Sequence, residues 1–134
     1  MRHKGLLIIL VLVLWPLLID AVTRDNFLMR TARDYVEVCS TPENDPLYQA
    51  AMGFCHGYGV GAVHYYLAAT SDGREASFVC LPNPPPPRTE AVQKFLTWAR
   101  ANSPFMDERP VDAIFRFWAP NGRARGKVMV GGRW

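Results

Sequence analysis

The stretch Cys55-His56-Gly57-Tyr58-Gly59-Val60-Gly61-Ala62 joins a cysteine, a series of glycines and an aromatic side chain inside a longer apolar segment, from Asp45 to Thr70. Small and aromatic side chains recur at helical spacing along this segment, which predicts an amphipathic helix that faces a core. Each glycine would cost a helix roughly 1 kcal/mol relative to alanine. We therefore expect another element to approach closely at Gly57 and Gly61, with Tyr58 filling the core; the alternative is a weak or broken helix. The predicted core face consists of Ala51, Cys55, Tyr58, Ala62 and Tyr66.

Three further segments show the periodicity of amphipathic helices. The first runs from about residue 23 to residue 38, the second starts with Thr89 as its cap, and the third enters at Arg109-Pro110. Together with the central segment, and without an alternating strand pattern, they predict an all-α, compact single domain of about four helices. Their expected core faces are Leu28, Ala32, Tyr35 and Cys39; Val92, Phe95, Leu96 and Ala99; and Val111, Ile114, Phe115 and Trp118.

A proline-rich segment separates the central helix from the next one. Phe78-Val79-Cys80-Leu81-Pro82 is a short apolar run that we expect to be extended and pinned to the core. The four prolines from Pro84 to Pro87 then predict a stiff connector of polyproline II type. Docking of these prolines on a partner is the alternative interpretation.

The N-terminus has the layout of a secretory signal peptide. Basic residues at positions 2 to 4 precede fourteen residues without a charge, from Leu6 to Ile19. An uncleaved membrane anchor is the alternative, and we expect an exported chain that begins near Val22. The predicted organisation is a signal peptide or anchor over residues 1–21, a helical domain over 22–122 and a basic flexible tail over 123–134.

Charge and residue chemistry argue against several classes of function. Without residues 1–21 the chain holds 13 basic and 11 acidic residues, a net charge of +2 that indicates no nucleic-acid partner. His56 and His64 would lie roughly 12 Å apart along a helix, too far to share a metal. Neighbouring side chains on a helix point about 100° apart, so His56 is poorly placed to activate Cys55. We predict no metal, no cofactor and no catalysis; an enzyme with Cys55 or Cys80 as nucleophile is the disfavoured alternative.

Taken in order, several segments resemble the Rap/Tai family of type VI secretion immunity proteins, which are small exported helical proteins that neutralise cell-wall amidases. The resemblance runs from about residue 26 to residue 120. It rests on Cys39 at the end of the first helix, Cys55 to Gly61 against the family's Cys-x-Gly-Tyr-x-x-Gly, Phe78 to Pro82 against its Cys-x-Pro, Phe95-Leu96-Thr97-Trp98 before Asn102-Ser103-Pro104, and the helix from Pro110 to Phe117.

The cysteines depart from the pattern of this family. Export would place Cys39, Cys55 and Cys80 in an oxidising compartment, where one disulfide and one free thiol is the simplest arrangement. Members of the family commonly carry a fourth cysteine after the last helix, next to a proline, whereas Asn121 follows Pro120 here. Both a Cys39–Cys55 and a Cys55–Cys80 bridge remain open, and each leaves one thiol unpaired.

The resemblance implies a function in binding. It implies an immunity protein of the periplasm that binds a secreted cell-wall amidase effector and occludes its active site, and also a homodimer. A membrane contact is expected only through an uncleaved N-terminal segment. The alternative function is a periplasmic structural or chaperone-like helical protein without a toxin partner. The residues expected in partner-binding loops are Pro84, Pro85, Pro86, Pro87 and Arg88, and Pro104, Phe105, Asp107 and Glu108.

Overall fold

The structure of this chain, a computed structural model, describes residues 21–71, 73, 79 and 81–119. In these ranges it has four α-helices, two short 3-10 helices and no strand, which confirms the predicted all-α class. The elements are η1 (Arg24–Leu28), α2 (Ala32–Cys39), α3 (Tyr48–Thr70), α4 (Arg88–Ala101), η2 (Ser103–Phe105) and α5 (Pro110–Trp118).

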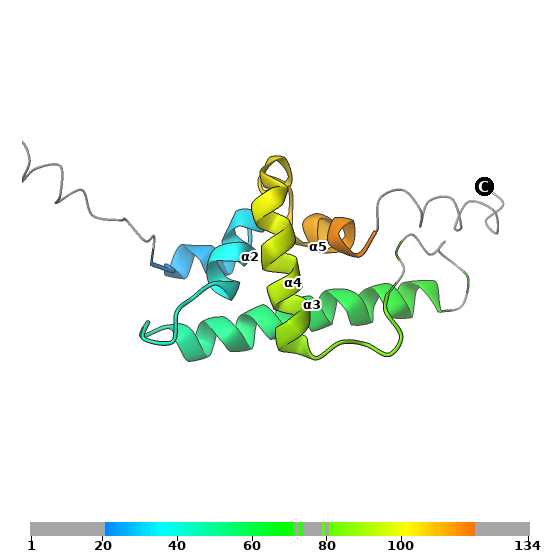
Figure 1. Cartoon of the computed structure of the whole chain (residues 1–134), viewed down its shortest axis with the longest axis horizontal. Coiled ribbons are helices and arrows are strands. Elements are labelled where there is room, and N and C mark those ends of the chain that lie inside the picture. Colours follow the sequence, from blue (N-terminus) through cyan, green and yellow to red (C-terminus); the bar gives the residue numbers. More distant parts are fainter. Residues whose placement is uncertain (1–20, 72, 74–78, 80, 120–134) are drawn as a thin grey trace, which may run out of the picture.

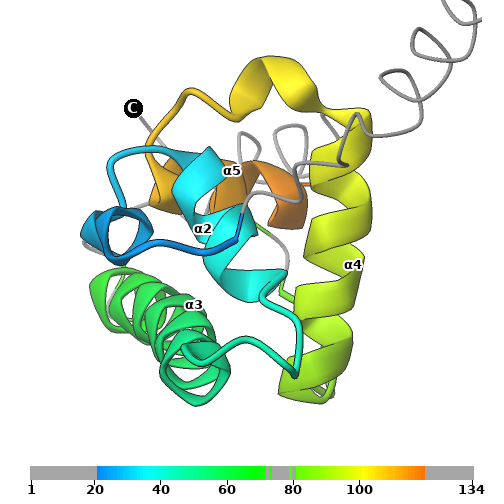
Figure 2. The same ribbon diagram turned by 90° about the vertical axis from the view of Figure 1, so that its left-hand side faces the viewer.

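The short helix α2 is the centre of the packing, since it contacts η1, α3, α4 and α5. In Figure 1 the long helix α3 runs along one side of the molecule and α4 crosses it. Figure 2 shows α2 and α5 filling the space between these two helices. The buried core therefore draws on every α-helix: Ala32, Tyr35, Val38 and Cys39 of α2, Ala51 and Cys55 of α3, Phe95, Leu96 and Ala99 of α4, and Ala113 and Ile114 of α5.

The expected single helix over residues 23–38 is wrong at its start, because the chain forms two pieces. The first piece, η1, is followed by Met29 in a left-handed conformation with φ 51° and ψ 45°, and α2 begins only after Thr31. This break turns Leu28 away from the predicted core face and leaves it 58% exposed. The other members of that face, Ala32, Tyr35 and Cys39, are buried as predicted.

Asp34 sets the point at which α2 begins. Its carboxylate accepts hydrogen bonds from the backbone N–H of Thr31 at 3.0 Å and from the side-chain amide of Asn26 at 3.1 Å. Burial raises the pKa of Asp34, but these hydrogen bonds outweigh it and hold the pKa below its ordinary value of 3.8. A carboxyl with a lowered pKa stabilises the fold above the pKa of the unfolded chain, and that stabilisation is lost as the pH falls.

We expect Asp34→Ala to lower the free energy of unfolding by about 1 kcal/mol at pH 7, the usual cost of losing a helix cap. The difference from the unmodified chain should narrow below about pH 4, where the carboxyl of the unfolded chain becomes protonated. Urea unfolding followed by circular dichroism at several pH values measures both effects. Asp25→Ala on the exposed side of η1 is the control and should change stability by less than about 0.5 kcal/mol. If Asp34→Ala lowers the free energy of unfolding by the same amount from pH 7 to pH 3, this role of the carboxylate is wrong.

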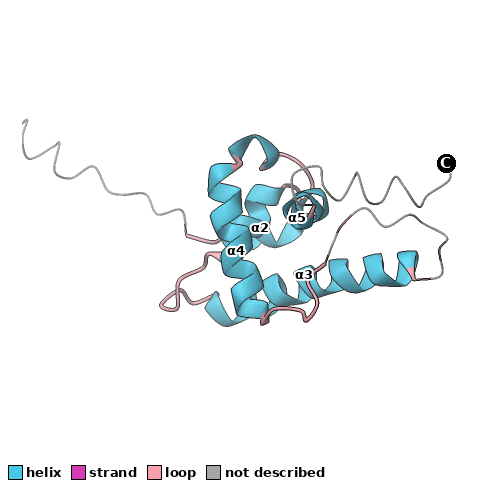
Figure 3. Cartoon of the chain, turned by 45° about the vertical axis from the view of Figure 1, so that its right-hand side comes forward, coloured by secondary structure: helices cyan, strands magenta, loops and turns pink. Residues whose placement is uncertain are grey.

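Helix α3 is continuous through its glycines, so the alternative of a broken helix is wrong. It begins at Tyr48, later than the start of the predicted segment at Asp45, because a turn precedes it in which Asp45 Oδ1 accepts the N–H of Leu47 at 2.7 Å. The predicted end at Thr70 is confirmed. Figure 3 shows the C-terminal part of α3 extending past the other described helices, and Tyr65 there is 75% exposed.

The last two α-helices follow the predicted pattern, with one correction. Thr89 is not the cap of α4, because the helix already begins at Arg88, with Pro87 in an extended conformation as its N-cap. Pro110 is the first residue of α5, as predicted, since a proline costs little where its missing N–H has no helical partner. Phe95, Leu96, Ala99 and Ile114 are buried as expected.

Several predictions concern residues that lie outside the described ranges. These are the signal peptide or anchor, described only at Ala21, the basic tail over 123–134, and Phe78 and Cys80 of the extended run. None of the helices in the described part of the chain combines the length and the apolarity that a membrane span requires.

Candidate partner-binding site

A disulfide between Cys39 and Cys55 joins the end of α2 to the N-terminal half of α3, with the two Cα atoms 5.2 Å apart. The alternative bridge between Cys55 and Cys80 is therefore wrong. Both bridged cysteines are buried. The bridge holds α3 against α2 at the centre of the core. It thereby helps to position the side chains on the adjacent face of α3.

Tyr35 of α2 makes the second link to α3. It is almost fully buried, and its hydroxyl donates a hydrogen bond to the carbonyl of Cys55 at 3.0 Å. Burial, together with the nearby Tyr58, raises the pKa of Tyr35 far above its ordinary value of 10. The Tyr35 hydroxyl is therefore neutral in the folded protein and acts as a fixed donor to α3.

The close approach predicted for the glycine series occurs at Gly59, whereas we expected it at Gly57 and Gly61. A Cβ atom on Gly59 would lie 2.8 Å from the Tyr35 hydroxyl, closer than van der Waals contact allows. At Gly57 and Gly61 a Cβ atom would meet nothing within 4 Å in the described part of the chain. The expected role of Tyr58 is closer to the structure: it is half-buried against the core, and its ring lies 5.4 Å from that of Tyr35.

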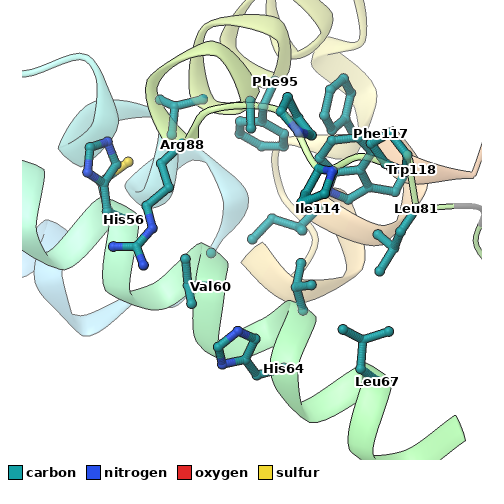
Figure 4. Close-up of a pocket in the computed structure, with 18 of the residues that line it drawn as sticks. His56, Val60, His64, Leu67, Leu81, Arg88, Phe95, Ile114, Phe117 and Trp118 are labelled. Carbon is teal, nitrogen blue, oxygen red and sulfur yellow. The ribbon is translucent and has the colours of Figure 1, made fainter. Parts of the chain in front are cut away.

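Beside the Tyr35 contact lies an apolar groove of about 590 Å³, within the size range of ligand-binding sites. One side is α3, and the other sides are the proline-rich loop, α4 and α5, as Figure 4 shows. Phe95, Phe117 and Trp118 give it an aromatic wall. The ring centroids of Phe95 and Phe117 are 5.8 Å apart, and those of Phe117 and Trp118 are 4.7 Å apart. The other side chains that line it include His56, Val60, Val63, His64 and Leu67 of α3, Leu81, Pro82, Pro85 and Pro86 of the loop, Arg88, Ala91 and Val92 of α4, and Ile114 of α5.

The wall formed by the loop is tied to α3 by Tyr66. Its hydroxyl accepts a hydrogen bond from the N–H of Val79 at 3.2 Å and donates one to the carbonyl of Val79 at 3.3 Å. Both residues are buried. The expectation that this segment is pinned to the core is therefore met at Val79. Leu81 and Pro82, which follow directly, are held beside α3 as part of the groove.

The described residues that line the groove carry positive charge and no negative charge. Arg88 is the charged side chain among the described residues that line it, and none of those residues is a carboxylic acid. Figure 4 shows Arg88 reaching from the start of α4 toward the face of α3 that carries His56 and His64. In the described ranges no three His, Cys, Asp or Glu side chains converge as they would around a metal ion. The groove is thus suited to an apolar group that carries a negative charge.

The sequence pattern of the Rap1a immunity proteins matches residues 31–121, which include all of α2, α3, α4 and α5. The chain belongs to the Rap1a family. This confirms the resemblance to the Rap/Tai immunity proteins. No curated protein and no solved structure matches the chain.

Membership of the Rap1a family gives the chain a general function. It is an immunity protein against a secreted effector, and binding that effector is its role. The family is one of binding proteins, which confirms the prediction that the chain is not an enzyme.

In this Rap1a protein the two predicted partner-binding loops lie at opposite ends of α4. A helix of 14 residues is about 21 Å long, so the two loops do not form one surface. The first loop belongs to the groove: Pro85, Pro86 and Arg88 line it, and Pro84 and Pro87 stand next to them. The peptide bond between Asn83 and Pro84 is cis.

The second loop, Ser103 to Glu108, is used inside the molecule. The carbonyls of Met106 and Glu108 accept the N–H groups of Arg33 and Ala32, which start α2, at 3.0 Å and 2.7 Å. The Glu108 carboxylate holds Arg116 through two hydrogen bonds, at 2.7 Å and 2.9 Å.

Phe105 and Asp107 of this second loop are also engaged inside the molecule, whereas Ser103 and Pro104 are exposed. Phe105 stacks on Trp98 with ring centroids 6.0 Å apart. The exposed Asp107 pairs with Arg33 at 3.0 Å. We therefore assign this loop a structural role and favour the groove for partner binding.

Sequence reasoning missed most of the groove because it followed a single stripe of α3. His56, Val60, Val63 and Leu67 recur at intervals of four, three and four residues, which is a second helical stripe. That spacing was the available signal. The aromatic side chains of α5 could not be connected to it before the crossing of the helices was known.

Proposed function

We propose that this chain is a periplasmic immunity protein that binds a secreted cell-wall amidase and covers the active site of that enzyme. The observation that carries the proposal is the match of residues 31–121 to the Rap1a immunity proteins. The resemblance to the Rap/Tai proteins, which neutralise cell-wall amidases, supports an amidase as the target.

Two features support a periplasmic location. The N-terminal segment has a basic start followed by an uncharged apolar run, the layout of an export signal. The Cys39–Cys55 disulfide suits an oxidising compartment such as the periplasm, where disulfides form and persist.

The proline-rich loop supports inhibition by occlusion. It forms one wall of the groove, and prolines restrict its backbone before any partner binds. A loop that is already ordered loses less conformational entropy on binding, which favours tight association. No catalytic group is needed for this mechanism, since a bound protein can exclude the large peptidoglycan substrate by its volume alone.

Co-expression tests the proposal. A secreted cell-wall amidase, the effector class of the proposal, directed to the periplasm of a host bacterium, should lyse the cells, and the full chain should protect them. Purified chain should also inhibit hydrolysis of isolated peptidoglycan at a molar ratio near one. Deletion of residues 1–21 is the control for location: protection should be lost while inhibition in the test tube remains. If the chain gives no protection and forms no complex with the amidase, the proposal is wrong, and the structural or chaperone-like alternative is favoured.

A homodimer is a second part of this proposal, and it too is implied by the resemblance. The exposed Tyr65 on the projecting part of α3 supports it, since this large aromatic side chain could bury its apolar surface against a second copy of the chain. Sedimentation velocity of the purified chain without an amidase measures this directly, and a monomer at all concentrations would refute it.

A further inference from the structure

We infer that the groove between α3, the proline-rich loop and α5 receives a protruding segment of the effector that carries a large apolar side chain next to a carboxylate. This inference rests on the proposed function, since the occupant is part of the effector. In this inference a segment of the effector inserts into the groove of this chain. This contact is separate from any loop of this chain that covers the active site of the effector.

The apolar part of the occupant follows from the lining. Most of the groove consists of aliphatic, aromatic and proline side chains, with Ile114 and Phe95 buried at its base. Leu67, on the α3 side, is 48% exposed, so it can still bury surface against a partner. A concave site with an aromatic wall is the usual place for a single dominant anchor residue in a protein interface. A volume of about 590 Å³ accommodates one large side chain together with its neighbours in the chain.

The negative charge of the occupant follows from Arg88. Its guanidinium is the charged group of the lining, and it reaches toward His56 and His64 on α3. The nearby Glu90 does not line the groove and is paired with Lys94 at 2.6 Å. An arginine at the rim of an apolar site is suited to a bidentate contact with a carboxylate. Charge complementarity therefore favours an acidic apolar segment.

The same charge argument disfavours the tail of this chain as the occupant. The sequence after residue 119 contains Arg123, Arg125, Lys127 and Arg133 and no acidic side chain. Placing these four cationic side chains beside Arg88 would bring together charges of one sign. A second copy of the chain is the other conceivable occupant, and it is distinguished by experiment below.

The test compares two groove variants with two matched controls in calorimetric titrations with the secreted cell-wall amidase used in the co-expression test. Leu67→Ser and Arg88→Glu should each weaken binding about tenfold or more, because an anchor contact or a charge pair is lost. Leu28→Ser on η1, where the leucine is 58% exposed, and Arg100→Glu in the last turn of α4 should bind like the unmodified chain. Arg88→Lys should retain most of the affinity, since it keeps the charge.

A second measurement uses anilinonaphthalene sulfonate, an apolar anion whose fluorescence rises in apolar sites. The unmodified chain should bind this probe, the amidase should displace it, and the two groove variants should bind it more weakly than their controls. Unchanged probe binding in both groove variants would overturn the chemistry assigned to the groove, whether or not an amidase binds.

The remaining outcomes separate the two proposals. If the unmodified chain does not bind the amidase, the proposed function fails, and the groove fails as a site for that effector. If the amidase binds all variants equally, the groove inference is wrong and the proposed function stands. If Leu67→Ser and Arg88→Glu abolish self-association and leave amidase binding unchanged, the occupant is a second copy, which also overturns the inference.

Discussion

Replacing Cys39 and Cys55 together with alanine should lower the free energy of unfolding by about 3 kcal/mol. The disulfide joins residues 16 positions apart, and closing a loop of this size restricts the unfolded chain by about that amount. Alanine is the suitable replacement because both cysteines are buried and a serine would add an unpaired hydroxyl. Denaturation by guanidinium chloride, followed by circular dichroism, measures the change.

Cys80→Ala is the matched control for the disulfide. The bridge uses Cys39 and Cys55, so removal of the third thiol should leave the free energy of unfolding within about 0.5 kcal/mol of that of the unmodified chain. Adding a reductant should reproduce the loss in the unmodified chain and have little effect on the double alanine variant. A peptide map under non-reducing conditions that links Cys55 to Cys80 would contradict the structure directly.

The disulfide also shows where sequence reasoning reached its limit. The number of cysteines predicts one bridge, but two pairings fit the distances that the chain can span. The choice depends on how α2 lies against α3, and that arrangement is fixed by buried contacts such as the hydrogen bond from Tyr35 to the Cys55 carbonyl. Contacts between residues far apart in the sequence leave no local signature.

Helix positions were predictable where the signal is local. The C-terminal end of α3 and the start of α5 were predicted from turn residues and from a proline at the first helical position, and both agree with the structure. The break before α2 was missed although its signal was present, because Thr31 followed by Asp34 is a capping pair that reads equally well as the interior of one longer helix. Periodicity across the break favoured the longer helix, and the local hydrogen bonds decide against it.

The two predicted partner loops also show the difference between features that have a local sequence signal and features that depend on tertiary packing. Both were predicted because proline lies next to charged residues, and this feature does not distinguish a contact with a partner from a contact inside the molecule. Glu108 and Phe105 are engaged by Arg116, which lies on α5, eight and eleven residues further along the chain. Arg88 instead lines the groove. Only the packing of α5 distinguishes a loop that caps a helix from a loop that borders a binding site.

Gly59→Ala should lower the free energy of unfolding by about 1–3 kcal/mol, the usual range for overpacking a core site. An alanine here would place its Cβ atom 2.8 Å from the hydroxyl of Tyr35, and this buried ring has little freedom to move away. Displacement of Tyr35 would also stretch its hydrogen bond to the Cys55 carbonyl. These costs exceed the gain of about 1 kcal/mol that alanine brings to a helix interior.

Gly57→Ala on the same helix separates the steric effect from helix propensity. No described atom lies within 4 Å of a Cβ at this position, so this variant should be more stable than the unmodified chain by about 0.5–1 kcal/mol. A double-mutant cycle identifies the clashing atom. In a Tyr35→Phe background the nearest ring atom to a Cβ on Gly59 would be 3.9 Å away, an ordinary contact, and Gly59→Ala should then stabilise the helix as Gly57→Ala does. An equal loss for Gly59→Ala in both backgrounds would show that the hydroxyl of Tyr35 is not what requires glycine.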